Sequence, residues 1–508
     1  MACEKISLID QARSTKFKNS LEGFLKAFNA NAKVQYIIAP SMSFDKRLLE
    51  GIDGIEHYEL RSFWEILRVK RKNTYVTFVS SEEVSDVVFE HFIDVFKLSA
   101  EEISRITFIR CPREKHELSL TKNILNNPKC IERIKSSLKT TNIILECFVR
   151  TGDEKKLADL LGVPSWYNHP QLDYFHTKSG NRFIVGKDAR MPKGISDLFS
   201  KESVIKALIK LKNDNLKCEF FMVKLNFGVS GQGNMKVLIN EQLWSKLDDS
   251  HKKSVVEKSF FEGTLFNQSL NINSFIQRII DEGAVVEEFI GGDIIDSPSA
   301  QLMVSPVGVD LISTHRQILD SYGQKFIGGE FPCESSYRDE ISSVALKIGE
   351  KLRKRKVYGV SSVDFLVSKF KGKVYCFVIE LNIRKGGTTH PFMLSSFAIQ
   401  ENGTFNGGVL VDQKQKNYTY RSNDNFYPCK KFSKTTSDLI HRSKEASLLF
   451  NQRTNKGVIF HLLNTYAASG KIGYTVIGTS KNEVHKYETL LKQVLSSSPE
   501  IKIYASNA

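Results

Sequence analysis

Residues 360–391 read VSSVDFLVSKFKGKVYCFVIELNIRKGGTTHP, which is the pattern of a β-hairpin whose second strand ends in polar residues. Apolar and polar residues alternate over 363–367, and 374–381 is almost continuously apolar apart from Glu380. The Lys-Gly-Lys between the two runs is typical of a tight turn. We therefore predict two antiparallel strands that meet at a turn centred on Gly372.

In that register Asp364 lies opposite Glu380, and cross-strand partners are only about 5 Å apart. Asn382 follows two residues later and projects from the same face of the strand. Two carboxylates and an amide oxygen at one place repel one another unless they share a cation, and hard oxygen ligands favour Mg²⁺. Arg384 comes next on this face and can clamp phosphate or carboxylate oxygens. A solvent-facing hairpin that carries acidic residues is the alternative interpretation.

The whole chain has the composition of a globular protein. Its 508 residues, 41% hydrophobic and 25% charged, are enough for about three or four domains of ordinary size. No apolar run approaches the ~18 residues of a membrane span. The N-terminus lacks the apolar core of a signal peptide, so we expect a cytoplasmic protein with no membrane partner. The eight Cys show no paired spacing and are expected to be reduced thiols.

The formal net charge of +15 raises nucleic acid or another polyanion as a ligand. The basic residues are dispersed, however, apart from short clusters at 68–72 and 351–356. Neither cluster accompanies a nucleic-acid-binding motif, and a solvated face is the simpler interpretation of the second. We therefore do not expect nucleic acid as a partner.

The first 165 residues alternate strand-like and helix-like segments. Short β-branched runs occur at 34–40, 74–80, 106–111 and 142–149, with amphipathic stretches between them. This alternation predicts an α/β domain with a parallel sheet covered by helices. No GxGxxG follows the first run, so a dinucleotide site of the usual type is not expected.

Residues 177–194 concentrate basic side chains, among them Lys178, around small turn residues. The pattern predicts a basic loop that is followed by a helix at 200–212. Taken alone, a basic loop of this kind is more often solvated surface than a binding site.

Residues 220–240 combine an apolar strand that carries Lys224 with a glycine-rich loop and a second strand. Glycines let backbone N–H groups approach phosphate oxygens, and a lysine adds positive charge. This is neither a Walker A loop, because no Lys-Ser/Thr pair follows it, nor a Rossmann loop, because a strand follows it. The pattern predicts a lid over a nucleotide, with an ordinary glycine-rich hairpin as the alternative. The loop residues are Gly228, Ser230, Gly231 and Gly233.

A further predicted strand, at 284–290, runs into a Gly-Gly break. A short apolar segment at the end of a strand can offer backbone N–H and C=O groups to the edge of an adenine. An acidic residue just beyond the break can bind ribose hydroxyls. The candidate nucleotide residues are Glu287, Glu288, Phe289, Ile290 and Asp293.

Two more strand-like segments follow at 300–306 and 310–317, and the second ends in Thr-His-Arg-Gln. A histidine in a strand is more often structural than catalytic. The position of His315 beside Arg and Gln at a strand end nevertheless makes it and Gln317 candidates for catalysis.

The order of these motifs resembles that of the ATP-grasp superfamily. It runs through Lys178, VKLN (223–226) with its glycine-rich loop, VEEFI (286–290), VDFLV (363–367) and IELNIR (379–384). Four further segments resemble the pheganomycin-type peptide ligases: SPSAQ (297–301), STHRQIL (313–319), GQKFIGGEFP (323–332) and ELNIRKGGTTHP (380–391). The resemblance covers nearly the whole chain and is strongest from about 177 to 391.

The resemblance implies an architecture of α/β and α+β domains. A Rossmann-like pre-ATP-grasp domain is expected over 1–165. An ATP-grasp region, whose two α+β subdomains clasp ATP, is expected over 166–395. A small α+β C-terminal domain over 396–508 would then wall the substrate cleft. Dimers are common in this superfamily, so the resemblance also allows a homodimer.

The resemblance also implies an activity, that of an ADP-forming carboxylate–amine ligase. Such an enzyme activates a small carboxylate as an acylphosphate and joins it to the amine of an amino acid or peptide, with ATP and Mg²⁺ as cofactors. Lys178 and Lys224 would hold the ATP phosphates, and Arg384 would stabilise the phosphoryl transition state. The metal ligands would be Asp364, Glu380 and Asn382. The activated carboxylate is expected beside Gly386, Gly387, Thr388 and His390, which continue directly from the metal strand.

Two other functional classes remain open. A binding or regulatory protein would keep the fold without ligation, and a phosphotransferase would stop at a phosphorylated product without any amine. Beyond residue 396 the sequence is polar and rich in Gly and Asn up to 425, which predicts an irregular segment before the last helices and strands. His461 lies in an apolar strand and is expected to be a core residue.

Overall fold

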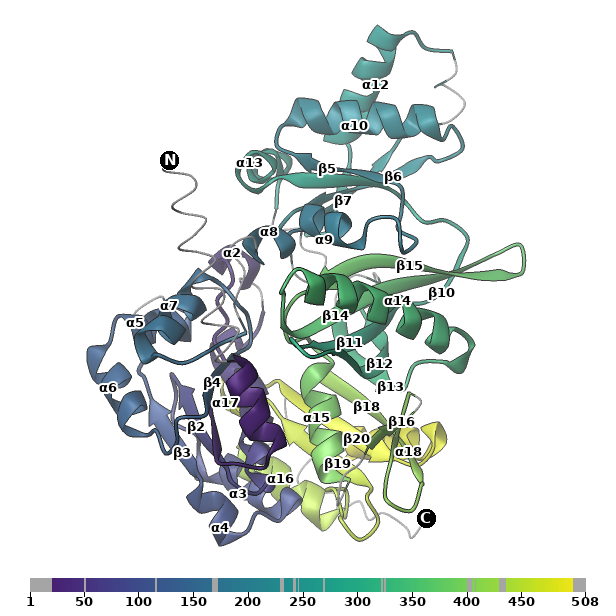
Figure 1. The fold of residues 1–508 in the computed structure, drawn as a ribbon. Helices are drawn as coiled ribbons and strands as arrows, with labels where there is room; N and C mark the ends of the chain where they lie inside the picture. Colours follow the sequence, from purple (N-terminus) through teal and green to yellow (C-terminus); the bar gives the residue numbers. More distant parts are fainter. Residues whose placement is uncertain are drawn as a thin grey trace.

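Three β-sheets organise the chain in the computed structural model (Figure 1). The structure describes residues 21–49, 52–114, 117–166, 172–228, 233–240, 244, 246–267, 270–320, 323, 326–399, 404–406, 408–428 and 435–496. Figure 1 places a five-stranded sheet at the top, a four-stranded sheet at the lower left and the C-terminal strands at the lower right. The predicted combination of α/β and α+β folding is confirmed.

The N-terminal sheet has the order β3-β2-β1-β4, and all its strands are parallel, as predicted. Its strands are β1 (Val34–Ala39), β2 (Thr74–Ser80), β3 (Ile106–Arg110) and β4 (Ile143–Cys147). The 3₁₀ helix η1 (Ile55–Lys70) and α3 (Asp86–Phe96) pack on one face. The other face is covered by α5 (Leu120–Leu125), α6 (Pro128–Ser136) and α7 (Gly152–Leu161). Two short helices, α2 (Lys46–Leu49) and α4 (Ala100–Ser104), complete this part.

The five-stranded sheet is antiparallel and has the order β5-β9-β6-β7-β8. Its strands are β5 (Gly194–Leu198), β6 (Phe220–Leu225), β7 (Asn234–Leu238), β8 (Thr264–Leu265) and β9 (Ala284–Glu288). It has a hydrophobic core of its own with α10 (Lys201–Asp214), α12 (Asp249–Phe261) and α13 (Ile272–Glu282). The predicted sequence of strand, glycine-rich loop and strand is present as β6 and β7.

Two short helices precede this sheet, α8 (Leu172–Phe175) and α9 (Lys178–Val185). The prediction of a basic loop beginning at 177 is wrong, because Lys178 is the first residue of α9. Thr177 caps that helix by accepting a hydrogen bond from the Gly180 N–H, which is the usual role of Thr at this position.

The largest sheet has eleven described strands, and β14 (Gly359–Phe370) lies near one end of it, where it pairs with β10 (Asp293–Asp296), β11 (Pro298–Val304) and β15 (Lys373–Asn382). The other strands are β12 (Val309–Leu319), β13 (Phe326–Phe331), β16 (Thr404–Asn406), β17 (Val409–Val411), β18 (Asn417–Phe426), β19 (Gly457–His461) and β20 (Ile472–Gly478). The helices of this part are α14 (Ser335–Lys354), α15 (Thr389–Ala398), α16 (Thr436–Glu445), α17 (Asn464–Ser469) and α18 (Lys481–Ser496).

The segment 400–425 was expected to be irregular, and that prediction is wrong where the structure describes it. Strand β18 joins β13 to β20 and so connects the C-terminal strands to the main sheet. Its buried residues alternate with half-exposed ones, and they include Tyr420, Ser422 and Asp424. The strand therefore shows the expected two-residue period of burial, but half of its buried positions are occupied by polar residues.

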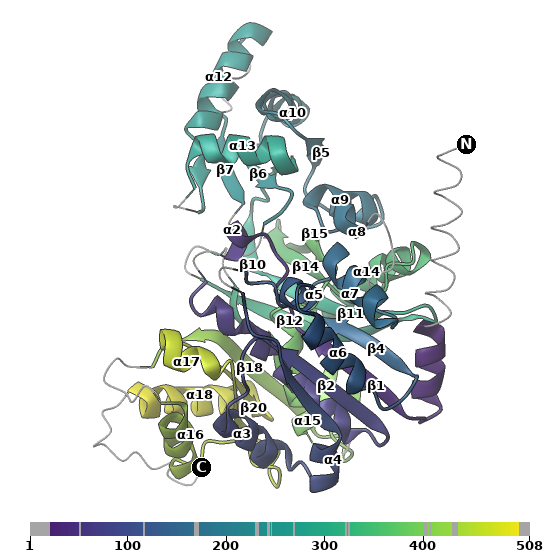
Figure 2. The same cartoon turned by 90° about the vertical axis from the view of Figure 1, so that its left-hand side faces the viewer.

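One continuous hydrophobic core runs from the N-terminal sheet through β11 and β14 to the C-terminal helices. Helix α15 packs against both η1 and β20, and Figure 2 shows α16 beside α3. The C-terminal strands share the sheet of the central region, and the division of the chain at 165 and 395 stays a prediction. No helix in the described ranges combines the length and apolarity that crossing a membrane requires.

Candidate active site

A cleft of about 490 Å³ is lined by residues of both antiparallel sheets. Lys224 and Glu287 face it from the five-stranded sheet, whereas Asp364 and Glu380 face it from the central hairpin. The two halves of the predicted nucleotide site, which are about 140 residues apart in the sequence, therefore line one cavity.

The predicted metal residues converge at the end of the hairpin. Asp364 pairs with Glu380 across the ladder, and Ser362 pairs with Asn382. The Nδ2 atom of Asn382 donates a hydrogen bond to Asp364 Oδ2 at 2.9 Å. All three predicted ligands line the cleft.

The turn of the hairpin and the regularity of its ladder differ from the prediction, although Asp364 still pairs with Glu380. Its turn has two residues, Lys371 and Gly372, both with positive φ, and is not centred on Gly372. A regular ladder closed by such a turn would set Asp364 opposite Ile379. A β-bulge beside Asp364 takes up one residue of β15, and Asp364 faces Glu380 as predicted.

Burial and the neighbouring charge of Glu380 raise the pKa of Asp364 to about 6. Burial would also raise the pKa of Glu380, but the Lys178 ammonium holds it below its usual range. Two half-buried carboxylates beside an amide form a set of hard oxygen donors, and a divalent cation would relieve their mutual repulsion. The donor set therefore fits Mg²⁺.

The two cleft lysines that the sequence assigns to ATP are both paired with carboxylates. Lys178 Nζ lies 2.6 Å from Glu380 Oε1, and Lys224 Nζ lies 2.6 Å from Glu287 Oε2. Glu287 also accepts a hydrogen bond from Arg182 Nη1 at 2.8 Å. Burial opposes ionisation of Glu287, yet Lys224 and Arg182 hold its pKa below the usual range. Glu287 thus positions cations at the cleft wall.

Of the glycine-rich segment, Gly228 follows β6 and Gly233 precedes β7, at the end of the ladder where Lys224 pairs with Asn234. Gly228 and Gly233 line the cleft beside Lys178 and Lys224. Ser230 and Gly231 lie outside the described residues.

The predicted adenine segment also lines the cleft, through Glu288, Phe289 and Ile290. The ring of Phe289 is 40% exposed, and Lys236 Nζ lies 4.6 Å from its centroid. The Phe289 N–H donates to the Phe220 carbonyl at 2.9 Å. Phe289 therefore has no free N–H for a base, and its ring and carbonyl are the groups that it can present.

Three predicted residues lie away from the cleft lining. Asp293 is exposed at the start of β10 and pairs with Lys369. His315 is fully buried, its Nε2 shares a hydrogen bond with the Tyr420 hydroxyl, and burial lowers its pKa to about 3. His390 is 2% exposed and bonds to Asp424. None of the three is among the residues that line the cleft. Their positions therefore do not support the predicted contacts of Asp293 with ribose, of His315 with the reactants and of His390 with the substrate.

Four other predicted residues do line the cleft beyond the metal set. They are Gln317, Gly386, Gly387 and Thr388. Arg384 lines it as well, and its guanidinium carbon lies 5.4 Å from the centroid of the Phe44 ring. The cleft thus continues from the metal set toward the N-terminal part of the chain.

Comparison with known proteins identifies this arrangement. Residues 170–384 match the family model described as IQCH-like, ATP-grasp. Residues 170–384 form an ATP-grasp domain. The predicted membership of the ATP-grasp superfamily is thereby confirmed. Residues 438–491 match a second model, the PGM1 C-terminal domain.

Two curated relatives and one solved structure extend the comparison. The chain is 22% identical over 470 residues to the L-propargylglycine–L-glutamate ligase of Streptantibioticus cattleyicolor, with 91% of the chain and 94% of the relative covered. It is 21% identical over 381 residues to IQ motif-containing protein H of Danio rerio, but the match spans 66% of the chain and only 36% of that relative. Biotin carboxylase of Campylobacter jejuni superposes with a TM-score of 0.51 at 12% identity, covering 92% of each chain, which shows the fold.

No sequence motif indicated several of the residues that line the ATP-grasp cleft. They come from segments before and after the ATP-grasp domain, and they include Phe44, Tyr58, Arg61, Asp424, Tyr427 and Lys471. Each stands in a segment without a recognisable motif, and only the tertiary fold brings the segments together.

One buried cluster behind the ATP-grasp cleft has the residue types of a metal site. The ligand atoms of His390, Asp424 and His461 lie within 4.8 Å of one another. Asp424 is already paired with the guanidinium of Arg61, which would repel a further cation. His390 Nε2 is hydrogen bonded to Asp424 at 3.1 Å, whereas His461 Nδ1 lies 3.7 Å from the same carboxylate. His461 is a core residue, as predicted.

Proposed function

We propose that the chain is an ATP-dependent carboxylate–amine ligase that releases ADP. Its substrates would be a small carboxylic acid or amino acid and the amine of an amino acid or peptide. One observation carries the proposal: the cleft joins a hard-metal ligand set, two lysines and an arginine in a single cavity. The relative named as a ligase of two amino acids, matched over 94% of its length, supports the same reaction class.

In this reaction each of the cleft residues would have a separate role. Lys178 and Lys224 would exchange their present carboxylate partners for phosphate oxygens. The ring of Phe289 would cover one face of the adenine. Arg384 would neutralise charge that develops on the transferred phosphoryl group. Gly386 and Gly387, which line the cleft near Arg384, would lie beside the carboxylate that accepts that group.

Asp364, Glu380 and Asn382 would hold Mg²⁺, which supplies positive charge at the phosphate oxygens when bound. No side chain has to act as a covalent nucleophile, because the carboxylate attacks the terminal phosphorus and the amine then attacks the acyl carbon. The site must exclude water, which would otherwise hydrolyse the acylphosphate. The cytoplasmic location and the homodimer stay predictions.

ADP release separates this proposal from its alternatives. The purified chain would be incubated with ATP, Mg²⁺ and pools of carboxylic acids, amino acids and dipeptides, and ADP and ligated products would be quantified. We expect ADP only when both a carboxylate and an amine are present, together with an equal amount of amide product. A phosphorylated product without any amine would favour a phosphotransferase. Nucleotide binding without turnover in any pool would favour a regulatory protein.

A further inference from the structure

Part of the cleft lining is apolar, and this part comes from the N-terminal region of the chain and not from the ATP-grasp domain. We call this set the apolar wall: Met42, Phe44, Leu49, Ile52 and Phe148. The first four lie between β1 and η1, and the fifth directly follows β4. Three of them are buried in one hydrophobic cluster, and Phe44 and Ile52 are half-buried and pack against it. None of these side chains suits a phosphate, Mg²⁺ or a carboxylate.

The apolar wall begins beside Arg384. The guanidinium carbon of Arg384 lies 5.4 Å from the centroid of the Phe44 ring. That ring meets Phe148 edge-on, with 6.5 Å between the centroids and 72° between the planes. The proposed function puts the transferred phosphoryl group and the carboxylate that accepts it at Arg384. A side chain of a small substrate can therefore pack on Phe44 while the reacting group of that substrate lies at Arg384.

Two serines alternate with the first wall residues, and neither of them lines the cleft. Ser43 Oγ donates a hydrogen bond to Glu154 Oε1 at 2.5 Å, and Ser41 Oγ lies 3.2 Å from Ser119 Oγ. Glu154 belongs to α7, and Ser119 is the N-cap of α5. These contacts hold the segment 41–44 against the N-terminal helices and satisfy both hydroxyl groups away from the cleft. The side chains of the wall therefore present hydrocarbon and thioether surface only.

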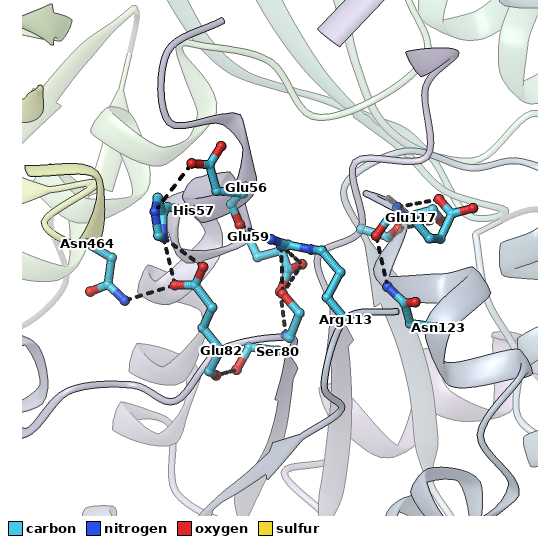
Figure 3. A network of polar contacts seen from close by, with 12 residues as sticks. Glu56, His57, Glu59, Ser80, Glu82, Arg113, Glu117, Asn123 and Asn464 are labelled. Atoms are coloured by element: carbon cyan, nitrogen blue, oxygen red, sulfur yellow. Dashed lines mark hydrogen bonds and ion pairs between the residues drawn. The ribbon is translucent and has the colours of Figure 1, made fainter. Parts of the chain in front are cut away.

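The other end of the apolar wall is connected to η1, because Ile52 lies three residues before that helix. Figure 3 shows the polar network that holds the start of η1. His57 shares a hydrogen bond with Glu82 Oε2 at 2.8 Å, and Glu59 accepts a hydrogen bond from Arg113 Nη2 at 3.2 Å. Glu82 follows β2 and Arg113 follows β3. Both ends of the wall are thus tied to the N-terminal sheet and its helices, so its shape is formed before a substrate binds.

An apolar surface in a binding cleft favours an apolar ligand group. Each methylene group that leaves water for such a surface raises the affinity by about fourfold. A hydroxyl, amide or carboxylate in the same place would lose its hydrogen bonds to water and find no donor or acceptor on the five wall side chains. The apolar wall therefore discriminates between substrates by the polarity of their side chains.

We infer that the apolar wall binds an apolar side chain of one of the two substrates, so that the enzyme selects an aliphatic or aromatic amino acid or an acid of similar character. This inference rests on the proposed ligase function and narrows it, since that function sets no condition on substrate side chains. The apolar group can belong to the acid that is activated or to the amine that attacks, because both reacting groups meet at Arg384. The experiment below distinguishes the two sources.

Competition between side chains of nearly equal size tests the inference. The wild-type chain would receive ATP, Mg²⁺ and the pools of the ADP assay, to which valine and threonine, leucine and asparagine, and methionine and glutamine are added in equimolar pairs. Tandem mass spectrometry would identify the side chains on the acyl side and on the amine side of each new bond. We expect the apolar member of each pair to exceed its polar partner by at least about tenfold on one side of the bond. The side that shows this preference identifies the substrate that packs on the wall.

Two matched variants assign the preference to the wall. Phe44→Gln adds an amide to it and should lower the ratio of apolar to polar product by about tenfold. Phe261→Gln, at a 48% exposed position at the end of α12 and outside the cleft, should leave the ratio unchanged. Both products form in one reaction, so their ratio does not depend on the overall rate or on the fraction of folded protein. If Phe44→Gln fails to fold, Ile52→Thr is a smaller change in the same wall and should lower the ratio about threefold.

Three results would contradict the inference. Equal yields within every pair on both sides of the bond would overturn it and leave the ligase function standing. A wild-type preference that the wall variant does not lower would also overturn it, because the selection would then arise elsewhere. The absence of ligated product together with the absence of ADP in every pool would overturn the ligase function and the inference with it.

Discussion

Lys178 Nζ lies 2.6 Å from Glu380 Oε1, which ties the first residue of α9 to the metal strand of the central hairpin. The lysine side chain is 14% exposed and the glutamate side chain 31% exposed, so the pair is partly shielded from water. The same lysine can neutralise the carboxylate or a phosphate oxygen. In the proposed function, nucleotide binding and the charge balance of Asp364, Glu380 and Asn382 would therefore be coupled through one side chain.

Replacing Lys178 with methionine should raise the KM for ATP by about tenfold or more, since a charge-assisted contact to phosphate contributes about 1.5–3 kcal/mol. Steady-state ADP release at varied ATP would measure the effect, with circular dichroism to check folding. Lys210→Met, on the exposed face of α10, serves as the matched control and should change nothing. An unchanged KM in Lys178→Met would remove Lys178 from the nucleotide site.

Asp364→Asn should abolish turnover and yet stabilise the nucleotide-free protein at pH 7.5. The pKa of Asp364 is about 6 in the fold, against an ordinary value near 3.9. Between about pH 4 and pH 6 the folded protein holds a proton that the unfolded chain has released, so stability falls as the pH rises through this window. The ionised carboxylate then costs at most about 3 kcal/mol at neutral pH.

Thermal denaturation at pH 5 and pH 7.5 would check this prediction. The Tm of Asp364→Asn should exceed that of the wild type at pH 7.5, and the gap should narrow at pH 5. Asp339→Asn, an exposed position on α14, should show neither effect. A lower Tm for Asp364→Asn at both pH values would contradict the assigned cost of ionisation.

The sequence predicts the hairpin and the convergence of Asp364, Glu380 and Asn382 well because both depend on local patterns. Period-two alternation places Asp364, Glu380 and Asn382 on one face whatever the rest of the chain does. The β-bulge could not be predicted, because nothing in VIELN distinguishes a bulged residue from a paired one. The correct pairing followed from a turn centre that was misplaced and a bulge that compensated for it.

The cleft residues from outside the ATP-grasp domain could not be predicted for a different reason. Tyr58, Arg61 and Lys471 sit in segments whose residue types are ordinary for helices and turns, and their meeting is a long-range property of the fold. Asp424 stands in a strand where polar residues occupy buried positions, so a search for apolar alternation passes over it. His315 shows the converse error, because a histidine beside Arg and Gln looked reactive although its side chain faces the core.

A substitution in the turn tests the hairpin geometry itself. Lys371 has a φ of 48° and Gly372 a φ of 80°, which is the left-handed pair that a two-residue hairpin turn requires. Asn tolerates this region better than Lys, so Lys371→Asn should raise the free energy of unfolding by about 0.5–1 kcal/mol. Urea denaturation would measure the gain, while turnover should stay within twofold. Lys373→Asn, in the strand just after the turn, should not raise the free energy of unfolding. An equal increase in both variants would contradict the turn assignment.

His315 should prove structural. Because its Nε2 is bonded to the buried Tyr420 hydroxyl, His315→Phe leaves that hydroxyl unsatisfied and should cost about 1–3 kcal/mol of stability. The kcat per folded molecule should remain within twofold. Tyr420→Phe removes the same bond from the other side, and the double variant should lose less than the sum of the two. A hundredfold fall in kcat at unchanged stability would restore a catalytic role for His315.

The free energy of unfolding should depend strongly on the buried ion pairs that Lys385 forms just after β15. Lys385 Nζ contacts Glu65 and lies 3.0 Å from Glu146 Oε2, and the lysine side chain is 7% exposed. Burial would raise the pKa of Glu146, but Lys385 and Arg68 hold it below its usual range. Lys385→Met removes one of the two cations, Lys385 and Arg68, that lie beside these buried carboxylates, and should cost about 3–5 kcal/mol at pH 8.

The loss in Lys385→Met should shrink at pH 5, since burial favours protonation of Glu146 once Lys385 is removed, and the double variant Glu65→Gln/Lys385→Met should recover part of it. Chemical denaturation of the four members of this cycle at both pH values would measure the coupling. A cost that is the same at pH 5 and pH 8, and that Glu65→Gln does not relieve, would mean that Lys385 stabilises the fold by packing. In that case the contact between η1 and the metal strand would not depend on charge.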